Sequence, residues 1–239
     1  MSETSATGDP FNSEFAAPGG LPPARLERFG LDNIPADTLQ GLQALYSAAY
    51  HNAQMYEDLI ADIERQPDVF QLLVARLDDQ PEIVVGAEVI ETKEHPFIDY
   101  LGYPPVHGKR FSVLPAFRSR GIGRQLITEG RRYAFEDLDL SVIFGESNEA
   151  GALSMYGREG SLYFLDSIKN SSRRNSPEDN VRFFAEFITN PLFRRYRYPQ
   201  GDGIRLAYPR DEQTAQFFRQ HGYVSKDDLL AKLGIDTSP

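Results

Sequence analysis

The stretch from Phe111 to Gly123 reads Phe-Ser-Val-Leu-Pro-Ala-Phe-Arg-Ser-Arg-Gly-Ile-Gly. An apolar run leads into a proline, a short basic segment with two glycines follows, and a helical pattern opens at Arg124. Glycine lets the main chain approach a ligand closely, and the free amides and positive dipole end of a helix N-terminus attract an anion. The stretch therefore predicts a strand, a phosphate-binding loop and a helix, in that order.

Two widespread phosphate-binding loops do not fit this stretch. A Walker A loop ends in Gly-Lys-Ser/Thr, whereas Gly123 is followed by Arg124 and Gln125. A dinucleotide fingerprint needs three glycines, and only Gly121 and Gly123 are present. The arginines of the stretch carry charge that suits a diphosphate. The alternative is an ordinary strand-to-helix turn that contains glycines.

The segment closely resembles the acyl-CoA loop of the GNAT superfamily of N-acyltransferases. In that family an apolar strand ends Val-x-Pro, and Arg-x-x-Gly-x-Gly/Ala and a helix follow. The matching positions are Val113, Pro115, Arg118, Gly121 and Gly123. The resemblance covers about residues 24–165 and a C-terminal remnant. It implies an α/β (α+β) fold with a mixed, mostly antiparallel central sheet, splayed between strands 4 and 5, and acetyl-CoA as the acyl donor.

The resemblance also implies which residues bind CoA. The loop and first helical turn would hold the pyrophosphate through Arg118, Ser119, Arg120, Gly121, Ile122, Gly123 and Arg124. In the family the pantetheine arm bonds to the fourth strand, which assigns that role to the main chain around Ser112 and Val113. Asn148, after the next strand, is expected to contact CoA as well.

The flanking patterns predict the remaining elements in the family's order. Apolar residues at helical spacing indicate helices from residue 37 to about residue 65, where Pro67 stops them. The other expected elements are strands at 24–29, 69–77, 82–91 and 140–144 and a helix from 121 to 135.

In members of this family, the helix that follows the fifth strand carries a tyrosine that can protonate the CoA thiolate. Its pattern, Asn-x-x-Ala-x-x-x-Tyr-x-x-x-Gly-Phe, is matched in part by two segments. The first aligns Glu149, Ala152, Tyr156 and Gly160, and the second aligns Asp211, Phe218, Gly222 and Tyr223.

We favour the first segment, because it directly follows the expected fifth strand and because Tyr156 keeps a hydroxyl that Phe218 lacks. A phenol with a pKa near 10 is a sensible proton donor to a leaving thiolate. The alternatives are that Tyr156 is a half-buried packing residue, or that the second segment holds the family's place and residues 146–203 are an insertion.

A base that deprotonates the amine is expected on the central strands. Glu88 lies inside the apolar run Ile83–Ile90, Glu146 ends the fifth strand, and His107 begins the fourth. Burial would raise the pKa of a carboxyl towards a useful value. For Glu88 we prefer the simpler interpretation, that it is solvated on the exposed face of a hairpin.

Residues 166–203 have no place in a minimal family member. Pro177, Glu178 and Asp179 predict a helix start, and an apolar stripe follows them. The basic and aromatic run 194–198 then suggests a cover over the acceptor pocket or a homodimer contact. Its arginines would bind an acceptor carboxylate or the 3′-phosphate of CoA.

Composition limits the function classes. The 239-residue chain has a net charge of −10 and no cysteine, which argues against nucleic acid as a partner and excludes disulfides and thiolate chemistry. The four histidines lack metal-ligand spacing, so no metal is expected. The sequence also predicts no membrane span and no secretory signal, hence a cytoplasmic protein. Residues 1–22 are expected to be disordered and residues 23–239 to form one domain.

Together these features predict an N-acetyltransferase that moves an acetyl group from acetyl-CoA to a primary amine of a small molecule. A sensor or scaffold that binds acyl-CoA without turnover is the alternative from another class. A transferase that takes its acyl group from an acidic acyl carrier protein is the alternative within the enzymes.

Overall fold

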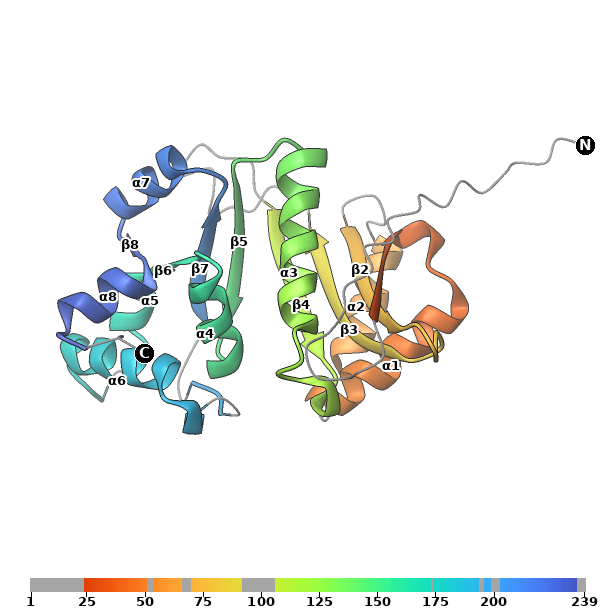
Figure 1. Ribbon diagram of the computed structural model, residues 1–239, viewed down its shortest axis with the longest axis horizontal. Coiled ribbons are helices and arrows are strands. Elements are labelled where there is room, and N and C mark those ends of the chain that lie inside the picture. The colour runs from red at the N-terminus through yellow and green to blue at the C-terminus, as the bar shows by residue number, and fades with distance from the viewer. Residues whose placement is uncertain are drawn as a thin grey trace, which may run out of the picture. The chain divides into compact units, whose positions relative to one another are not determined.

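The computed structural model describes residues 24–50, 54–65, 70–91, 106–172, 174–193, 196–198 and 203–235. The chain divides into two compact units: Met1–Glu91 with Arg110–Gly130, and Thr92–Lys109 with Arg131–Pro239. Figure 1 labels most of the helices and strands of both. The segment 1–22 lies outside the described residues, and the single domain over 23–239 stays a prediction.

The first unit is built on an antiparallel sheet. Its strands, in the order β1-β2-β3-β4, are β1 (Ala24–Gly30), β2 (Phe70–Leu77), β3 (Val84–Glu91) and the end of β4 (Val106–Val113). β2 pairs antiparallel with both β1 and β3. The amide of Leu114, just past β4, donates to the carbonyl of Val85 on β3 at 2.9 Å. The strands expected in this half of the chain are thus confirmed.

Two helices, α1 (Ala36–Tyr50) and α2 (Gln54–Arg65), pack on one face of this sheet (Figure 1). A short 3-10 turn, η1 (Leu31–Asn33), precedes them. The apolar positions with helical spacing pack against this sheet: Leu59 of α2 is buried, and Met55 and Ile63 lie half-buried against the same core. The core between helices and sheet consists of Leu42, Leu45, Tyr46, Leu59, Leu72, Val74, Val84, Ala87 and Val89.

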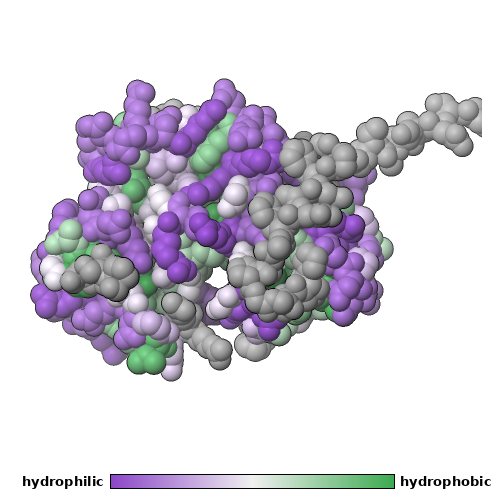
Figure 2. All heavy atoms as spheres, viewed as in Figure 1, coloured by the Kyte–Doolittle hydropathy of each residue, from purple (hydrophilic) through white to green (hydrophobic). Residues whose placement is uncertain are grey.

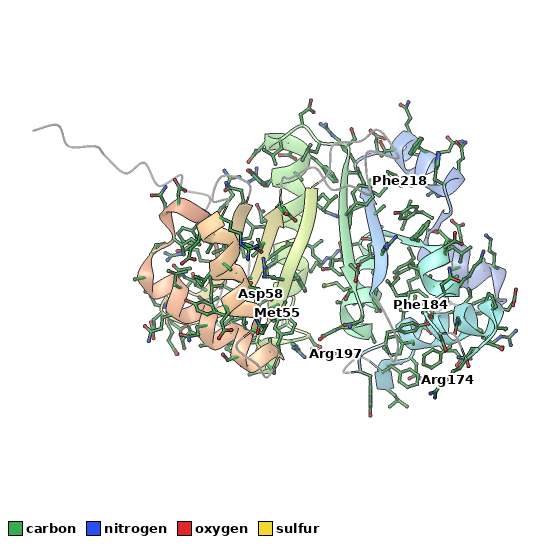
Figure 3. The ribbon with its side chains drawn as sticks, turned by 180° about the vertical axis from the view of Figure 1, so that it is seen from behind. Met55, Asp58, Arg174, Phe184, Arg197 and Phe218 are labelled. Carbon is green, nitrogen blue, oxygen red and sulfur yellow. The ribbon has the colours of Figure 1, made fainter. Side chains whose placement is uncertain are left out.

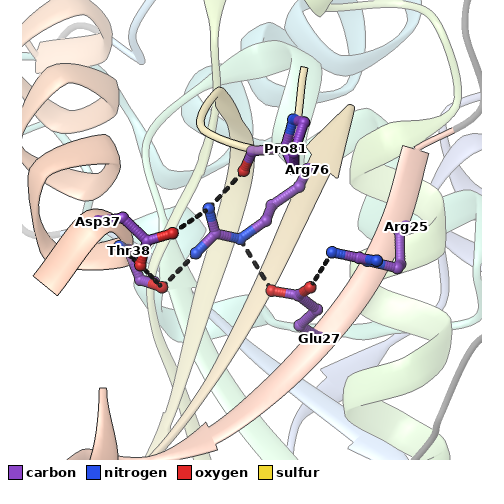
Figure 4. Close-up of polar contacts among 6 residues, drawn as sticks. All are labelled: Arg25, Glu27, Asp37, Thr38, Arg76 and Pro81. Carbon is purple, nitrogen blue, oxygen red and sulfur yellow. Dashed lines mark hydrogen bonds and ion pairs between the residues drawn. The ribbon is translucent and has the colours of Figure 1, made fainter. Parts of the chain in front are cut away.

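A buried arginine forms polar contacts with several elements of this unit (Figure 4). The side chain of Arg76, on β2, is 4% exposed, and its Nε lies 2.8 Å from Oε2 of Glu27 on β1. The same guanidinium binds the hydroxyl of Thr38 and the carbonyl of Pro81 and faces Asp37. Because these partners come from β1, from α1 and from the turn before β3, this one side chain of β2 joins four parts of the unit.

The other face of β3 is covered by helix α3 (Ile122–Arg132). A Cβ placed on Gly86 would lie 2.9 Å from Ile122 and 3.0 Å from Leu126, so the helix and strand approach closely there. A Cβ on Gly130 would meet Glu88 of β3 at 2.9 Å. A short turn, η3 (Pro115–Phe117), connects β4 to the loop before α3.

The second unit continues from a π-helical turn, η4 (Tyr133–Asp137), into a mixed sheet. The strands that follow β4 are, in order, β5 (Val142–Ser147), β7 (Ile204–Pro209), β6 (Leu162–Phe164) and β8 (Tyr223–Val224). All pair antiparallel except β4 with β5, whose parallel pairing spans three residue pairs, from Val106–Ile143 to Gly108–Gly145. A mixed, mostly antiparallel sheet is confirmed.

The predicted insertion lies between β6 and β7. It contains α5 (Leu165–Lys169), α6 (Pro177–Thr189) and the turn η5 (Pro191–Phe193). Ser176 caps α6 as its side chain accepts from the amide of Asp179, just where the sequence predicts a helix start. Phe184 of α6 packs against Tyr163 and Tyr198 with ring centroids 5.1 and 5.6 Å apart (Figure 3). Leu192 of the turn η5 is 78% exposed, and Figure 2 shows a few hydrophobic atoms at the surface of this unit.

The two segments that share one sequence pattern form two copies of one local structure. Helix α4 (Ala150–Arg158) connects β5 to β6, and helix α7 (Glu212–Gln220) connects β7 to β8. After each helix a glycine adopts a left-handed backbone, Gly160 with φ +90° and Gly222 with φ +87°, and a strand begins within two residues. The last element is α8 (Lys226–Lys232). None of the described helices combines the length and the apolar character that crossing a bilayer requires.

Candidate active site

The predicted phosphate loop joins β4 to α3 within the first unit. The carbonyl of Val113, the last residue of β4, accepts a hydrogen bond from Nε of Arg118 at 3.1 Å. Ser119 and Gly121 then adopt positive φ values of 64° and 90°. A Cβ on Gly121 would have no atom within 4 Å, so the backbone conformation, and not a lack of space, requires glycine there.

The loop presents positive charge beside the helix N-terminus. Arg118 and Arg124 are exposed, and the guanidinium of Arg120 lies 5.3 Å from the ring centroid of Phe117. Helix α3 begins at Ile122, directly after the left-handed glycine, and the first amides of a helix have no partner within it. This arrangement of amides, helix dipole and arginines fits a diphosphate such as that of CoA.

The strand before the loop is bound to both the sheet and the helices. Ser112 is 4% exposed, and its carbonyl lies 3.3 Å from a Cβ placed on Gly86, which puts that carbonyl on the β3 side of β4. Three residues before Val113, Arg110 has a left-handed φ of 49°. The hydroxyls of Tyr46 and Tyr50 donate to main-chain carbonyls at this point. Sequence reasoning missed both tyrosines, because their helical spacing reads as core.

Glu88 is not solvated, and the preference for an exposed hairpin position is therefore wrong. Glu88 is only 7% exposed, and its carboxylate lies between β3 and Gly130 of α3. The prediction failed because the second face of β3 is covered by α3. Whether Glu88 acts as a base stays a proposal.

In the second unit Tyr156 lies on α4, three residues after the buried Leu153. The side chain is half-buried and packs against the core cluster formed by α4, α6 and α8. Its helix follows β5 with two residues between them. By contrast, Phe218 of the second segment is fully buried in a separate aromatic core, 5.5 Å from Phe144 between ring centroids (Figure 3).

The two other candidates of this unit make local contacts. Oε1 of Glu146, near the end of β5, accepts from the amide of Gly203 at 2.8 Å, just before β7 begins. A Cβ on Gly203 would lie 2.5 Å from the Glu146 side chain. The main-chain carbonyl of Asn148, in the connection between β5 and α4, accepts from the amide of Tyr198 at 2.5 Å. The bond to the Gly203 amide gives Glu146 a structural role that does not require catalysis.

The remaining candidate base is His107, and the sequence predicts no metal site. The side chain of His107 lies outside the described part of the chain, as do His51 and His95. Within the described ranges, no group of three or more His, Asp or Glu side chains is placed to hold a metal ion.

Several solved structures that are similar to this chain are described as acetyltransferases, all at low sequence identity. One is YhbS from Escherichia coli, a GNAT family N-acetyltransferase in complex with CoA, at 19% identity over 63% of this chain and 74% of that one, with a TM-score of 0.47. Another is the spermidine/spermine N-acetyltransferase SpeG from Vibrio cholerae, at 14% identity over 83% and 98%, also with a TM-score of 0.47. The ribosomal-protein-S18-alanine N-acetyltransferase from Escherichia coli has 13% identity over 77% and 93% and a TM-score of 0.46. At these scores none of them bears on substrate or mechanism.

Curated proteins contain no match to this sequence. The model of the acetyltransferase (GNAT) family matches residues 37–160. That range is more than half of the 239-residue chain and contains the phosphate loop, Glu88 and α4. It ends before the insertion and before α7. The chain belongs to the GNAT acetyltransferase family.

Proposed function

We propose that this protein is an acetyl-CoA-dependent N-acetyltransferase whose acceptor is a primary amine of a small molecule. The neutral amine attacks the thioester carbonyl carbon, a C–N bond forms, and the C–S bond breaks as the thiolate leaves with its electron pair. The observation that carries the proposal is the loop from Arg118 to Gly123, with its left-handed glycine at the N-terminus of α3. The proposed location of this enzyme is the cytoplasm.

CoA binding is assigned to the first unit. The pyrophosphate would bind the amides of the first turn of α3 and the arginines of the loop. On the strand, Val113 is the better candidate for the pantetheine arm, because the Ser112 carbonyl lies on the β3 side. Since Arg118 already bonds to the Val113 carbonyl, we assign the pantetheine contact to the Val113 amide.

The proton donor to the leaving thiolate is proposed to be Tyr156. Its helix directly follows β5 and lies inside residues 37–160, which the family model matches, whereas α7 lies outside them. Glu88 is kept as the proposed base, because it is a buried carboxylate on a central strand. Glu146 is the weaker candidate for the base, because its bond to the Gly203 amide already gives it a structural role.

The test is a thiol-release assay in which acetyl-CoA is offered with a panel of primary amines. Release that requires an amine supports the proposal. CoA binding without turnover over the whole panel would replace it with the sensor or scaffold. Turnover with acyl groups on a carrier protein, without binding of free CoA, would replace the donor.

A further inference from the structure

Strand β4 contains a kink at a residue that is not glycine. Arg110 has φ 49°, in the left-handed region that residues with a Cβ adopt at an energetic cost. Such a conformation persists where the surrounding structure enforces it, and such positions gather at functional sites. The kink lies three residues before Val113, where the loop contacts begin.

Three side chains from the helices of the same unit hold this kink. The hydroxyl of Tyr46 donates to the carbonyl of Arg110 at 3.2 Å, and that of Tyr50 donates to the carbonyl of Phe111 at 2.9 Å. The guanidinium of Arg110 binds the carboxylate of Asp62 on α2. Helix α2 can be found in Figure 3 by two of its own residues, Met55 and Asp58, which are labelled there.

These contacts are specific and more than general packing. Tyr46 is fully buried, so its hydroxyl is a polar group that packing alone would not place inside the core. The side chain of Arg110 is 11% exposed, and its buried Nη1 has no hydrogen-bond partner in the described part of the chain. A segment selected for stability alone would use neither a left-handed arginine nor an unsatisfied guanidinium nitrogen.

The kink is linked to the phosphate loop by a short path. The Phe111 carbonyl is held by Tyr50, and two residues later the Val113 carbonyl is held by Arg118 of the loop. The peptide planes between them are therefore fixed at both ends. The direction of the Val113 amide depends on those planes.

We propose that Tyr46, Tyr50 and Asp62 are positioning residues for the acyl donor, which hold the kink in β4 so that Val113 and the phosphate loop are set for CoA. This inference rests on the proposed function, since it assumes that CoA binds at that loop. In this proposal the three residues act on CoA through their bonds to Arg110 and Phe111 of β4.

The experiment measures CoA affinity by isothermal titration calorimetry for Tyr46→Phe, Tyr50→Phe and a control, Tyr163→Phe. Each substitution removes one hydroxyl and keeps the ring. The control is matched, because Tyr163 is fully buried and its hydroxyl donates to the carbonyl of Leu153 at 2.7 Å in the second unit. We expect the Kd for CoA to rise about 3- to 10-fold in each of the two α1 variants and to stay unchanged in the control. The KM for acetyl-CoA should rise with it, and kcat should change less.

The outcomes separate this inference from the proposed function. If the wild-type protein does not bind CoA, the proposed function fails, and the inference fails with it. If the wild-type protein binds CoA and both α1 variants bind it equally well, or if the control loses as much affinity as they do, the inference alone is overturned. If Tyr46→Phe does not fold, Tyr50→Phe and Asp62→Asn decide, because Tyr50 and Asp62 are only half-buried.

Discussion

The carbonyl of Val113 and Nε of Arg118 are 3.1 Å apart, so the first arginine of the phosphate loop is bonded to the strand that precedes it. The bond closes the turn η3 and directs the chain towards Gly121. Arg118 therefore has two tasks in the proposed function, since it shapes the loop and carries charge towards a diphosphate.

The first prediction separates these two tasks of Arg118. Arg118→Ala removes both, and we expect the Kd for CoA to rise roughly 10- to 100-fold, as for loss of a charge-assisted hydrogen bond. Arg118→Lys keeps the charge but has no Nε in the same place, so its Kd should lie between those of wild type and Arg118→Ala. Calorimetry with CoA measures both. Equal affinities for Arg118→Lys and Arg118→Ala would mean that charge at this position has no part in binding.

The second prediction concerns Gly121. Gly121→Asp should abolish CoA binding, because φ +90° strains any other residue and the carboxylate would face the proposed pyrophosphate site. Gly121→Ala is the control, since a Cβ meets no atom within 4 Å, and this variant should keep weakened binding. Unchanged CoA affinity in Gly121→Asp would contradict the assignment of the phosphate site.

The third prediction tests Tyr156 as the proton donor. Tyr156→Phe should lower kcat about 100-fold and leave the KM for acetyl-CoA nearly unchanged, because the hydroxyl acts only as the thiolate leaves. Tyr163→Phe is the control, since its buried hydroxyl donates to the carbonyl of Leu153 on the same helix at 2.7 Å. That variant should lose stability but keep kcat within about twofold. A normal kcat in Tyr156→Phe would leave Tyr156 as a packing residue.

Much of the fold was predictable because local signals agreed with the family pattern. The loop at Gly121 combines a strand end, a proline, arginines and two glycines within thirteen residues, and each has a local physical meaning. The doubled pattern at Tyr156 and Phe218 was ambiguous as sequence. It marks a shared local structure, a helix that ends in a left-handed glycine before a strand, and only the order of elements distinguishes the two copies.

Other features depend on contacts between distant residues and leave no local signal. The kink at Arg110 is held by residues 48 to 64 positions away, and no composition rule indicates a left-handed arginine. Glu88 was expected to be solvated, because alternation along β3 does not reveal that α3 covers its second face. The Arg76 network combines partners up to 49 residues apart for the same reason.

The fourth prediction is about the stability that Arg76 provides. Arg76→Met should lower the free energy of unfolding by about 3 kcal/mol, because it leaves the carboxylate of Glu27, 23% exposed, without its buried partner. Arg25→Met is the control: Arg25 bonds to the same carboxylate at 2.6 Å but is 41% exposed, so its loss should cost less than about 1 kcal/mol. Urea unfolding followed by circular dichroism measures both. Equal losses would show that burial of Arg76 adds nothing to the network.

The fifth prediction concerns the glycines that end α4 and α7. Gly160→Ala should lower the free energy of unfolding by about 1–2 kcal/mol, and Gly222→Ala by a similar amount, because both require a left-handed backbone. Space is not the cause, since a Cβ at Gly160 meets no atom within 4 Å and one at Gly222 meets Phe164 only at 3.6 Å. Gly145→Ala is the matched control, because it also has open space but lies within β5 without a positive φ, and it should be close to neutral. Equal losses at all three glycines would mean that the left-handed turns do not account for the pattern that the two segments share.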